Sequence, residues 1–294
     1  MTNYPDYLRT YPNMDSASPL HISLNHIPHG FRAHRHDFLE FSFVISGRGK
    51  ERINDASHPM RPGTFTFVLP YQVHEIFTEP DEPLVLYNCM FSMDLLIESG
   101  QDDGLLAWMD HYDQQPSIQL DEDDLARMRL LIEDLAHEYN SDEVWKHTYI
   151  QIKLKEILIR FDRIRRKQGD LCTTTPTSTV KNNYVWPIIQ YIHHHYQEEL
   201  SLSGLSQKFT MSASRISELI KETTGQTFVH FLHDLRIRHA ASLLVTTDMS
   251  VAEIALEVGY GSYNTFSRVF RSMKGIVPKE YRKRKLELRA EQRQ

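Results

Sequence analysis

The sequence predicts an α+β protein of several domains: a β-barrel first, a helical segment next, and an all-α domain last. Three observations support this order. Short apolar runs broken by Gly and Pro precede residue 92, apolar residues recur at helical spacing after residue 120, and a pair of helices occurs twice near the C-terminus. The polar, Thr-rich run QGDLCTTTPTSTVKNN indicates a linker. We expect a barrel over 1–118, a helical segment over 119–168, a linker over 169–183 and a helical domain over 184–294.

Composition is typical of a globular chain, with 40% hydrophobic and 24% charged residues. Cys89 and Cys172 are far apart in sequence and fit no disulfide or zinc framework, which favours a reducing compartment and hence the cytoplasm. The N-terminus has no apolar signal core, and no apolar run approaches the ~20 residues that a membrane helix needs. We therefore expect no association with a membrane.

The net charge of −6 is unevenly distributed along the chain. Residues 184–294 hold 15 Lys and Arg against 11 Asp and Glu, a net charge of +4, so the remainder carries −10. Acidity of the whole chain would argue against a polyanionic partner, but the basic C-terminal part restores that option. The densest basic run, YRKRK at 281–285, by itself favours a solvated helix end or a frayed tail.

The first domain is expected to consist of short strands. HDFLEFSFVISGRG and GTFTFVLP are rich in Phe, Val and Ile, and Gly and Pro interrupt them. Several such runs within about 70 residues indicate a small all-β barrel or sandwich.

Two helices are expected after the strands. The first begins at LDEDDLARMRLLIEDLAHEYN, where Asp121 can cap it and the acidic first turn suits the positive helix end. This helix and the next, WKHTYIQIKLKEILIRFDRIRRK, each carry a heptad-like apolar seam. The seams consist of Leu125, Met128, Ile132, Leu135 and Tyr139, and of Ile150, Leu154, Ile157, Phe161 and Ile164. They could close on each other or on the barrel, and a seam left over would form the homodimer interface that we expect.

The last domain contains a repeat. LSLSGLSQKF aligns with MSVAEIALEV, and ISELIKETTG aligns with FSRVFRSMKG. Ser250 and Glu253 can form a capping box, and both copies end in Gly, which suits a left-handed helix stop. A helix, a brief turn and a second helix form the helix-turn-helix pattern, whose second helix enters the DNA major groove. The segment between the copies, FVHFLHDLRIRHAASLLV, would form a rod of about 27 Å, which can hold two such helices about one duplex turn apart.

The exposed side of each second helix distinguishes a DNA-binding unit from a plain helical bundle. In SYNTFSRVFRSMKG, apolar residues fall on one side, and Asn264, Thr265, Arg268 and Arg271 fall on the other. Ordinary exposed helices carry Glu/Lys pairs, whereas groove-binding helices need small hydrogen-bonding residues and positive charge. We therefore expect this domain to bind double-stranded DNA.

These motifs resemble those of the AraC/XylS family of bacterial transcription regulators. The resemblance spans about residues 185–284 and depends on LSLSGLSQKF, SASRISELIKETTGQTF, LRIRHAASLL, MSVAEIALEVGYGSYNTFSRVFR and GIVPKEYRK. It implies sequence-specific promoter binding through both helix-turn-helix units, often as a dimer, with RNA polymerase as a further partner. It also implies regulation by a ligand or partner that acts on the N-terminal domain.

By position, the resemblance implies a set of DNA-contacting residues on the two groove-binding helices. Arg268 is the best candidate for a bidentate guanine contact, and Asn264 could pair with adenine. Glu218 occupies the position of Arg268 in the first unit, so that unit either accepts a hydrogen bond from cytosine or binds more weakly; we expect weaker binding. The expected DNA-binding residues are Ser212, Ser214, Arg215, Ser217, Lys221, Ser262, Tyr263, Asn264, Thr265, Arg268 and Arg271.

A second candidate site lies in the barrel. GFRAHRHDFLEFSFVISG contains His34, His36 and Glu40, which would share one face of a single strand, and PGTFTFVLPYQVHE adds His74. The pattern H-x-H-x3-E-x6-G, followed by P-G…P-x3-H, resembles the two motifs of cupin barrels, whose metal-containing members bring these four residues together. Three interpretations remain open. The four residues and Asn88 could bind a hydroxylated effector, the four could hold Fe, Mn, Ni or Zn, or their side chains could simply be satisfied or solvated.

Regulators of this family that have cupin domains usually bind an effector, often a sugar, without a metal. We therefore expect a cupin-like barrel that binds a small effector of carbohydrate type, no cofactor, and regulation of transcription rather than enzymatic catalysis. The alternative is a metal-dependent cupin sensor or enzyme fused to a DNA-binding module, with a divalent metal at His34, His36, Glu40 and His74.

Overall fold

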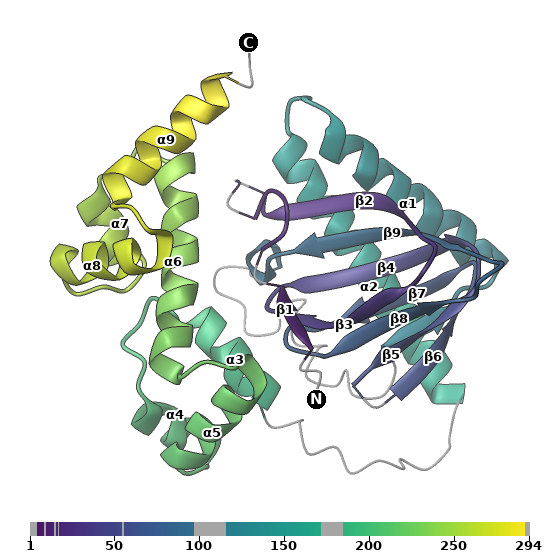
Figure 1. Ribbon diagram of the computed structural model, residues 1–294, viewed down its shortest axis with the longest axis horizontal. Coiled ribbons are helices and arrows are strands. Elements are labelled where there is room, and N and C mark those ends of the chain that lie inside the picture. The colour runs from purple at the N-terminus through teal and green to yellow at the C-terminus, as the bar shows by residue number, and fades with distance from the viewer. Residues whose placement is uncertain are drawn as a thin grey trace. The chain divides into compact units, whose positions relative to one another are not determined.

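A computed structural model describes residues 5–8, 10–14, 16, 18–54, 56–96, 116–171 and 185–291 (Figure 1). The chain divides into two compact units, one made of residues 1–14 and 18–179 and the other of residues 15–17 and 180–294. Within the expected linker, helix α2 continues to Leu171, and residues 172–183 lie outside the described part. No helix in the described ranges combines the length and the apolar character that a membrane span requires.

The N-terminal unit is built on two five-stranded sheets, which realise the α+β fold predicted for the chain. In both sheets neighbouring strands pair antiparallel, except that β1 runs parallel to β3. One sheet has the order β1 (Asp6–Leu8), β3 (Phe31–His36), β8 (His74–Thr78), β5 (Gly49–Ile53) and β6 (Ala56–Met60). The other has the order β10 (Ser117–Gln119), β7 (Thr64–Val68), β4 (Leu39–Ser46), β9 (Leu84–Phe91) and β2 (Leu20–Ile27), and a 3-10 helix η1 (Met93–Leu95) follows β9.

Strand β4 is buried on both of its faces, which explains the nearly continuous apolar run in its sequence. Phe41 stacks on Phe65 of β7, with ring centroids 5.0 Å apart. Phe65 in turn lies 5.0 Å from Phe161 of helix α2, so this side of the sheet faces the helices. The alternate residues face the barrel interior. One end of that interior is an apolar cluster of Val44, Met60, Ile76, Leu84 and Leu86.

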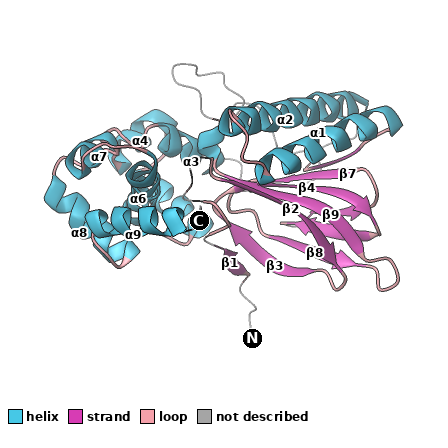
Figure 2. Ribbon diagram, turned by 90° about the horizontal axis from the view of Figure 1, so that it is seen from above, coloured by secondary structure: helices cyan, strands magenta, loops and turns pink. Residues whose placement is uncertain are grey.

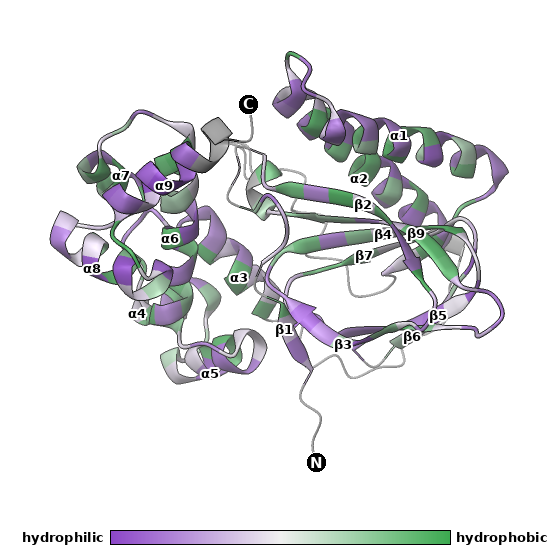
Figure 3. Cartoon of the chain, turned by 45° about the horizontal axis from the view of Figure 1, so that its top comes forward, coloured by the Kyte–Doolittle hydropathy of each residue, from purple (hydrophilic) through white to green (hydrophobic). Residues whose placement is uncertain are grey.

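Helices α1 (Glu122–Asn140) and α2 (Lys146–Leu171) cover the sheet that contains β4 (Figure 2). Asp121 caps α1 as predicted, since its side chain accepts from the amide of Asp124 at 2.8 Å. Both helices alternate between polar and apolar positions along their length (Figure 3). Of the predicted seam residues, Met128, Ile132, Leu135, Ile150, Leu154, Ile157, Phe161 and Ile164 are buried. Since Phe161 contacts both Phe65 and Phe67, the α2 seam closes on the barrel of the same chain.

The C-terminal unit is helical and contains the predicted repeat. Its elements are α3 (Val185–His194), α4 (Leu202–Phe209), α5 (Ala213–Thr224), α6 (Phe228–Thr246), α7 (Val251–Glu257), α8 (Tyr263–Lys274) and α9 (Pro278–Glu291). The pairs α4–α5 and α7–α8 are the two helix-turn-helix units, and α6 connects them (Figure 1). Gly225 and Gly275 end α5 and α8 with φ angles of 75° and 77°, and the capping box of Ser250 and Glu253 is present.

Candidate functional sites

Helix α8 has one buried and one exposed face. Phe266 and Phe270 are fully buried, and Phe270 packs edge-on against Tyr281 of α9 at 5.4 Å between ring centroids. The predicted residues Asn264, Thr265, Arg268 and Arg271 all lie on the exposed face. All of these except Thr265 border an open surface groove, which is lined by Tyr263, Asn264, Ser267, Arg268, Arg271, Ser272, Gly275 and Val277. Sequence reasoning missed Ser267 and Ser272 there, although Ser267 lies one helical turn after Asn264 and could have been found by that spacing.

The two groove-binding helices differ in charge. Helix α8 contains two Arg and one Lys and no acidic residue. Helix α5 contains one Arg and one Lys against two Glu. Arg215 Nη1 lies 2.6 Å from an oxygen of Glu218 and 3.9 Å from one of Glu222. Within the described part of the chain, no ion pair engages Arg268 or Arg271, so the second unit has more positive charge available for phosphates.

Several of the predicted serines cap the helices. Ser212 accepts from the amide of Arg215 at 3.2 Å and begins α5, and Ser262 accepts from the amide of Thr265 at 3.3 Å and begins α8. Each cap leaves the hydroxyl at the helix N-terminus, where backbone dipoles attract anions. In α5, Ser214 and Lys221 are exposed and Ser217 is half-buried. The predicted DNA-binding residues therefore lie at the surface, and their roles in binding stay predictions.

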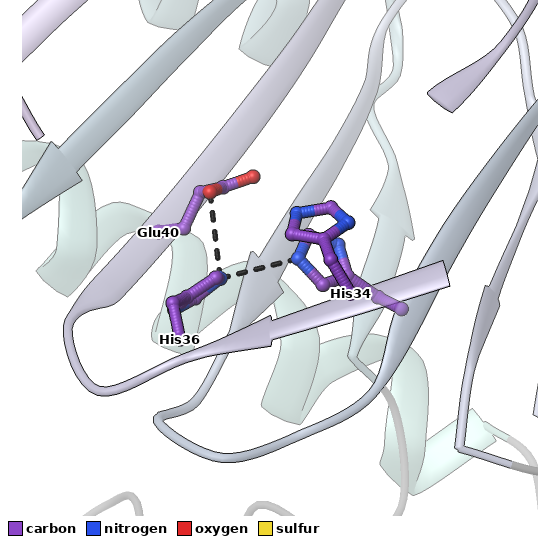
Figure 4. Close-up of side chains that lie close together, drawn as sticks. His34, His36 and Glu40 are labelled. Atoms are coloured by element: carbon purple, nitrogen blue, oxygen red, sulfur yellow. Dashed lines mark hydrogen bonds and ion pairs between the residues drawn. The ribbon is translucent and has the colours of Figure 1, made fainter. Parts of the chain in front are cut away.

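The four barrel residues converge, but from a different arrangement than expected. His36 ends β3 and Glu40 lies on β4, because a turn at Asp37 and Phe38 separates the two strands. The expectation of one strand face was wrong on this point. His74 begins β8, next to β3 in the same sheet. One ligand atom from each of His34, His36, Glu40 and His74 lies within 4.8 Å of every other, and all four side chains are buried. Figure 4 shows three of them, His34, His36 and Glu40.

Backbone hydrogen bonds orient two of the histidines. His36 Nδ1 donates to the carbonyl of Phe38 at 2.8 Å, and His34 Nδ1 donates to the carbonyl of Arg32 at 3.0 Å. A carbonyl only accepts, so Nδ1 carries the hydrogen and Nε2 of each neutral ring keeps its lone pair. Burial lowers the pKa of His34 to about 4 and holds the pKa of His36 well below its usual range. Both rings are therefore neutral near pH 7.

A buried carboxylate orients the third histidine. His74 Nδ1 lies 3.0 Å from Glu51 Oε1. Burial by itself raises the pKa of Glu51, but hydrogen bonds with His58 and His74 lower it to about 2. Burial lowers the pKa of His74, but the hydrogen bond to Glu51 and the charge of Glu40 raise it overall. His74 Nε2 lies 3.1 Å from His36 Nε2, which in turn lies 3.4 Å from a Glu40 oxygen.

The barrel interior also holds polar groups that sequence reasoning missed. Glu51 and His58 stand 3.3 Å apart, and Thr66 lies 3.1 Å from His58. Glu51 was not identified from the sequence, because it lies between two charged residues in the run K-E-R. Those neighbours point to solvent, and the alternation of the strand turns the Glu51 side chain inward. The predicted Asn88 donates to Glu40 Oε1 at 2.9 Å. Among the described residues, Asn88 Oδ1 and Ser42 Oγ are buried without a hydrogen-bond partner.

Comparison with known proteins gives matches over both units. A model of the AraC-like ligand binding domain matches residues 17–144, and a model of a helix-turn-helix domain matches residues 205–284. The HTH-type transcriptional activator RhaR of Mannheimia succiniciproducens is 25% identical over 92% of this chain and 94% of its own length. The protein of that name from Yersinia pseudotuberculosis is 23% identical over 95% and 92%. Among solved structures, the C-terminal domain of AraT, a response regulator from Geobacillus stearothermophilus, is 32% identical over 37% of this chain and 88% of that domain, with a TM-score of 0.34.

Proposed function

This chain belongs to the AraC/XylS family of transcription regulators, and we propose that its C-terminal unit binds promoter DNA while its N-terminal unit adjusts that binding in response to a small molecule. The observation that carries the first part is the exposed face of α8. It presents Asn264, Arg268 and Arg271 on a helix whose opposite face is fixed in the core by Phe266 and Phe270.

The chemistry of each side chain suggests which part of the duplex it contacts, a base or a phosphate. Arg268 presents a planar fork of donors that matches O6 and N7 of guanine. Asn264 can exchange two hydrogen bonds with adenine. Arg271 follows Arg268 by three residues and is assigned to a phosphate, which fixes the register of the helix without selecting a base. The first unit contributes less, because Glu218 neutralises Arg215 on α5.

Equilibrium binding tests this part of the proposal. The full-length protein is used to select a duplex from a random library, and its affinity for that duplex is compared with its affinity for a scrambled duplex at one stated salt concentration. We expect the selected duplex to bind at least about 1,000-fold more tightly, as sequence-specific regulators do. Equal affinities would show that the C-terminal unit does not recognise sequence.

The effector is proposed to be a small hydroxylated molecule of carbohydrate type. Support comes from the unpaired atoms of Ser42 and Asn88 beside Glu40, because buried polar atoms without a partner are the groups that a ligand hydroxyl can satisfy. A sugar at 100 times its dissociation constant would stabilise the unit that binds it by about 2.7 kcal/mol. A thermal-shift panel of sugars on metal-free protein therefore identifies the effector. Substituting Ser42→Ala should reduce the shift that the matching sugar gives.

Effector control requires that the ligand change the affinity for DNA, since a ligand shifts an equilibrium only by its differential binding to the two states. Operator binding is measured with and without each sugar that binds the barrel. If operator affinity is the same in every case, the barrel does not regulate DNA binding. Such a result would leave sequence recognition by the C-terminal unit intact.

A specific observation favours a second candidate, a divalent metal in the barrel. Nε2 of His36 and Nε2 of His74 lie 3.1 Å apart, and a backbone carbonyl or a carboxylate occupies Nδ1 of each ring. Two lone pairs at that distance repel each other unless a proton or a metal ion lies near both. In metal sites the ligating histidines likewise donate their second nitrogen to a carbonyl or carboxylate. The donor set therefore fits a metal: three imidazoles and the Glu40 carboxylate suit Fe, Mn, Ni or Zn.

In that case His34, His36, Glu40 and His74 would hold the ion, and a bound divalent metal would supply a fixed positive charge in the barrel. Elemental analysis of purified protein distinguishes the two candidates. Stoichiometric metal that is lost in His36→Ala and in His74→Ala supports the metal site. Metal-free protein whose melting temperature rises with a sugar supports the hydroxylated effector alone. His58→Ala is the matched control, because that half-buried histidine of the same barrel lies outside the four-residue cluster.

The homodimer is proposed through a stripe on α2 that sequence reasoning did not identify. The predicted seam faces the barrel, but Tyr149, Ile152 and Ile159 recur at three and seven residues on the outer side of α2 and stay exposed, as does Leu130 of α1. A two-fold dimer would pack this stripe against the same stripe of a second copy. Binding of a promoter further implies that RNA polymerase is a partner and that the protein acts in the bacterial cytoplasm, as a regulator rather than an enzyme.

A further inference from the structure

We propose that a bracket between the two helix-turn-helix units sets the distance and angle between α5 and α8, and so determines which spacing of half-sites the protein accepts. The bracket consists of the loop Tyr196–Glu198, before α4, and the turn Glu257–Tyr260, between α7 and α8. The inference depends on the proposed binding of DNA by both units. The bracket acts in addition to α6, the helix that connects the two units along the chain.

Arg236 of α6 links the two parts of the bracket. Its side chain is buried, with 8% of the residue exposed. Nε donates to the carbonyl of Tyr196 and Nη2 to that of Glu198, each at 2.7 Å. The same guanidinium lies 5.5 Å from the ring centroid of Tyr260, in the turn of the second unit. One buried cation therefore links the loop that leads into the first helix-turn-helix unit to the turn of the second.

The second unit contains an arginine that makes the same kind of carbonyl contacts but stays within its own unit. Arg282 of α9 donates to the carbonyls of Leu244 at 2.9 Å and Met249 at 2.6 Å, just before α7. In both repeats, therefore, an arginine donates hydrogen bonds to backbone carbonyls that precede the helix-turn-helix unit. The contact with Tyr260 is the part that distinguishes Arg236, and it crosses from one unit to the other.

Gly259 shows how closely the two parts approach. Its φ is +84°, and a Cβ built there would lie 2.5 Å from the carbonyl oxygen of Gln197 and 2.9 Å from Arg236 Nη2. The repeat places Thr210 at the corresponding turn of the first unit, also left-handed with a φ of 53°. A left-handed turn in this fold therefore accepts a side chain. Glycine is needed in the second unit because the loop of the first unit occupies the space.

Tyr260 holds the turn against α6. Its ring stacks on that of His233 with an interplanar angle of 6°, and its hydroxyl lies 3.0 Å from His233 Nδ1. Gln197 adds a direct contact between the two parts of the bracket, since its Nε2 donates to Glu257 Oε1 at 3.2 Å. Contacts away from the α6 axis resist bending and rotation of one unit relative to the other. The geometry of α5 and α8 is therefore set before DNA binds.

The test compares two glycine substitutions. Gly259→Ala forces the two parts of the bracket apart. Gly275→Ala is the matched control, because Gly275 has a φ of +77° and a Cβ there would meet nothing within 4 Å. Both variants place an alanine at a positive φ, so both carry the same kind of backbone strain. A difference in behaviour between them therefore reports the steric crowding at Gly259. Circular dichroism and the melting temperature verify that each variant is folded.

The first readout needs no DNA. Spin labels are attached at Glu222→Cys on α5 and Ser272→Cys on α8, two exposed positions. Pulsed electron paramagnetic resonance then measures the distance between the two helices in the full chain. The chain has two cysteines of its own. Cys172→Ser removes one of them, and burial raises the pKa of the other thiol, Cys89, and keeps it unreactive toward the label. We expect one narrow distance distribution in the parent and in Gly275→Ala, and a shifted or broadened one in Gly259→Ala. An unchanged distribution in Gly259→Ala overturns the inference.

The second readout is half-site spacing. The selected duplex is compared with versions that carry one base pair more or fewer between the two half-sites. The parent should lose at least about tenfold in affinity, because one base pair rotates a half-site by about a tenth of a turn. Gly275 lines the groove beside α8, so Gly275→Ala is a control for the distance measurement alone. Gly259→Ala should discriminate less, whereas a uniform loss on all three duplexes would assign the bracket a purely structural role. If Gly259→Ala does not fold, His233→Ala replaces it in both measurements.

These readouts separate the failure of the inference from the failure of the proposed function. If only one unit binds DNA, the spacing assay shows no discrimination even in the parent, whereas the spin-label distances still report the bracket. If both units bind DNA and Gly259→Ala keeps the parent's distances and spacing preference, the bracket does not set the geometry.

Discussion

Removing the carboxylate of Glu218 should strengthen the binding of DNA. In the structure, Glu218 holds Arg215 at 2.6 Å on the exposed side of α5, with side chains that are 57% and 45% exposed. In Glu218→Gln the guanidinium keeps only its longer contact with Glu222, at 3.9 Å, and becomes available to a phosphate. A negative charge near the duplex also disappears. The pair lies at the surface, so its loss should change the free energy of unfolding by no more than about 1 kcal/mol.

The size of the effect follows from counterion release. One additional phosphate contact steepens the slope of log K against log salt by about 0.9 for a B-DNA duplex. Between 50 and 200 mM salt that slope corresponds to a factor of roughly 3.5. The gain in affinity of Glu218→Gln over the parent should therefore be about 3.5 times larger at the lower salt concentration than at the higher.

Fluorescence anisotropy with the selected duplex measures both affinities across a salt series. Glu156→Gln is the matched control, since it removes a half-buried carboxylate that lies 2.9 Å from Arg160, on α2 in the N-terminal unit. The control should leave the salt slope unchanged. A loss of affinity in Glu218→Gln, confined to duplexes with cytosine at one position, would refute this reasoning and assign Glu218 to a base.

Three further predictions concern other parts of the chain. Arg268→Ala should cost about 1–3 kcal/mol of binding free energy and relax specificity at one base pair, whereas a uniform loss on all sequences would make Arg268 a phosphate contact. Ile152→Asp should abolish the proposed dimer in light scattering, because it places a charge in the exposed α2 stripe; a parent that is already monomeric contradicts the interface. Phe161→Ala should destabilise the N-terminal unit by about 3–5 kcal/mol in urea unfolding, since its buried ring joins α2 to β7; a change under 1 kcal/mol would show that the α2 seam contributes little.

Local sequence signals predicted much of the fold. The caps at Asp121 and Ser250 and the stops at Gly225 and Gly275 depend on neighbouring backbone atoms, so short motifs were sufficient to locate them. The repeat predicted both helix-turn-helix units for the same reason, since each unit recurs as a continuous segment.

Features that depend on contacts between distant segments were harder to predict. The α2 seam looked ready to pair with another helix, and only the Phe-rich outer side of β4 and β7 shows that it closes on the barrel. Glu51 was not identified from the sequence, where charged residues flank it, yet it orients His74 inside the barrel. The need for glycine at position 259 follows from a carbonyl that is 62 residues away in sequence, at Gln197. No local pattern carries that information.

Hydroxyl-radical footprinting on the selected duplex tests most directly whether both units bind one face of the DNA. The parent protein should protect two backbone segments on one face of the duplex, about 10–10.5 base pairs apart, centre to centre. Arg268→Ala should weaken one of them, and Lys221→Ala the other. Protection of a single segment, with no effect of the α5 substitution, would contradict the account.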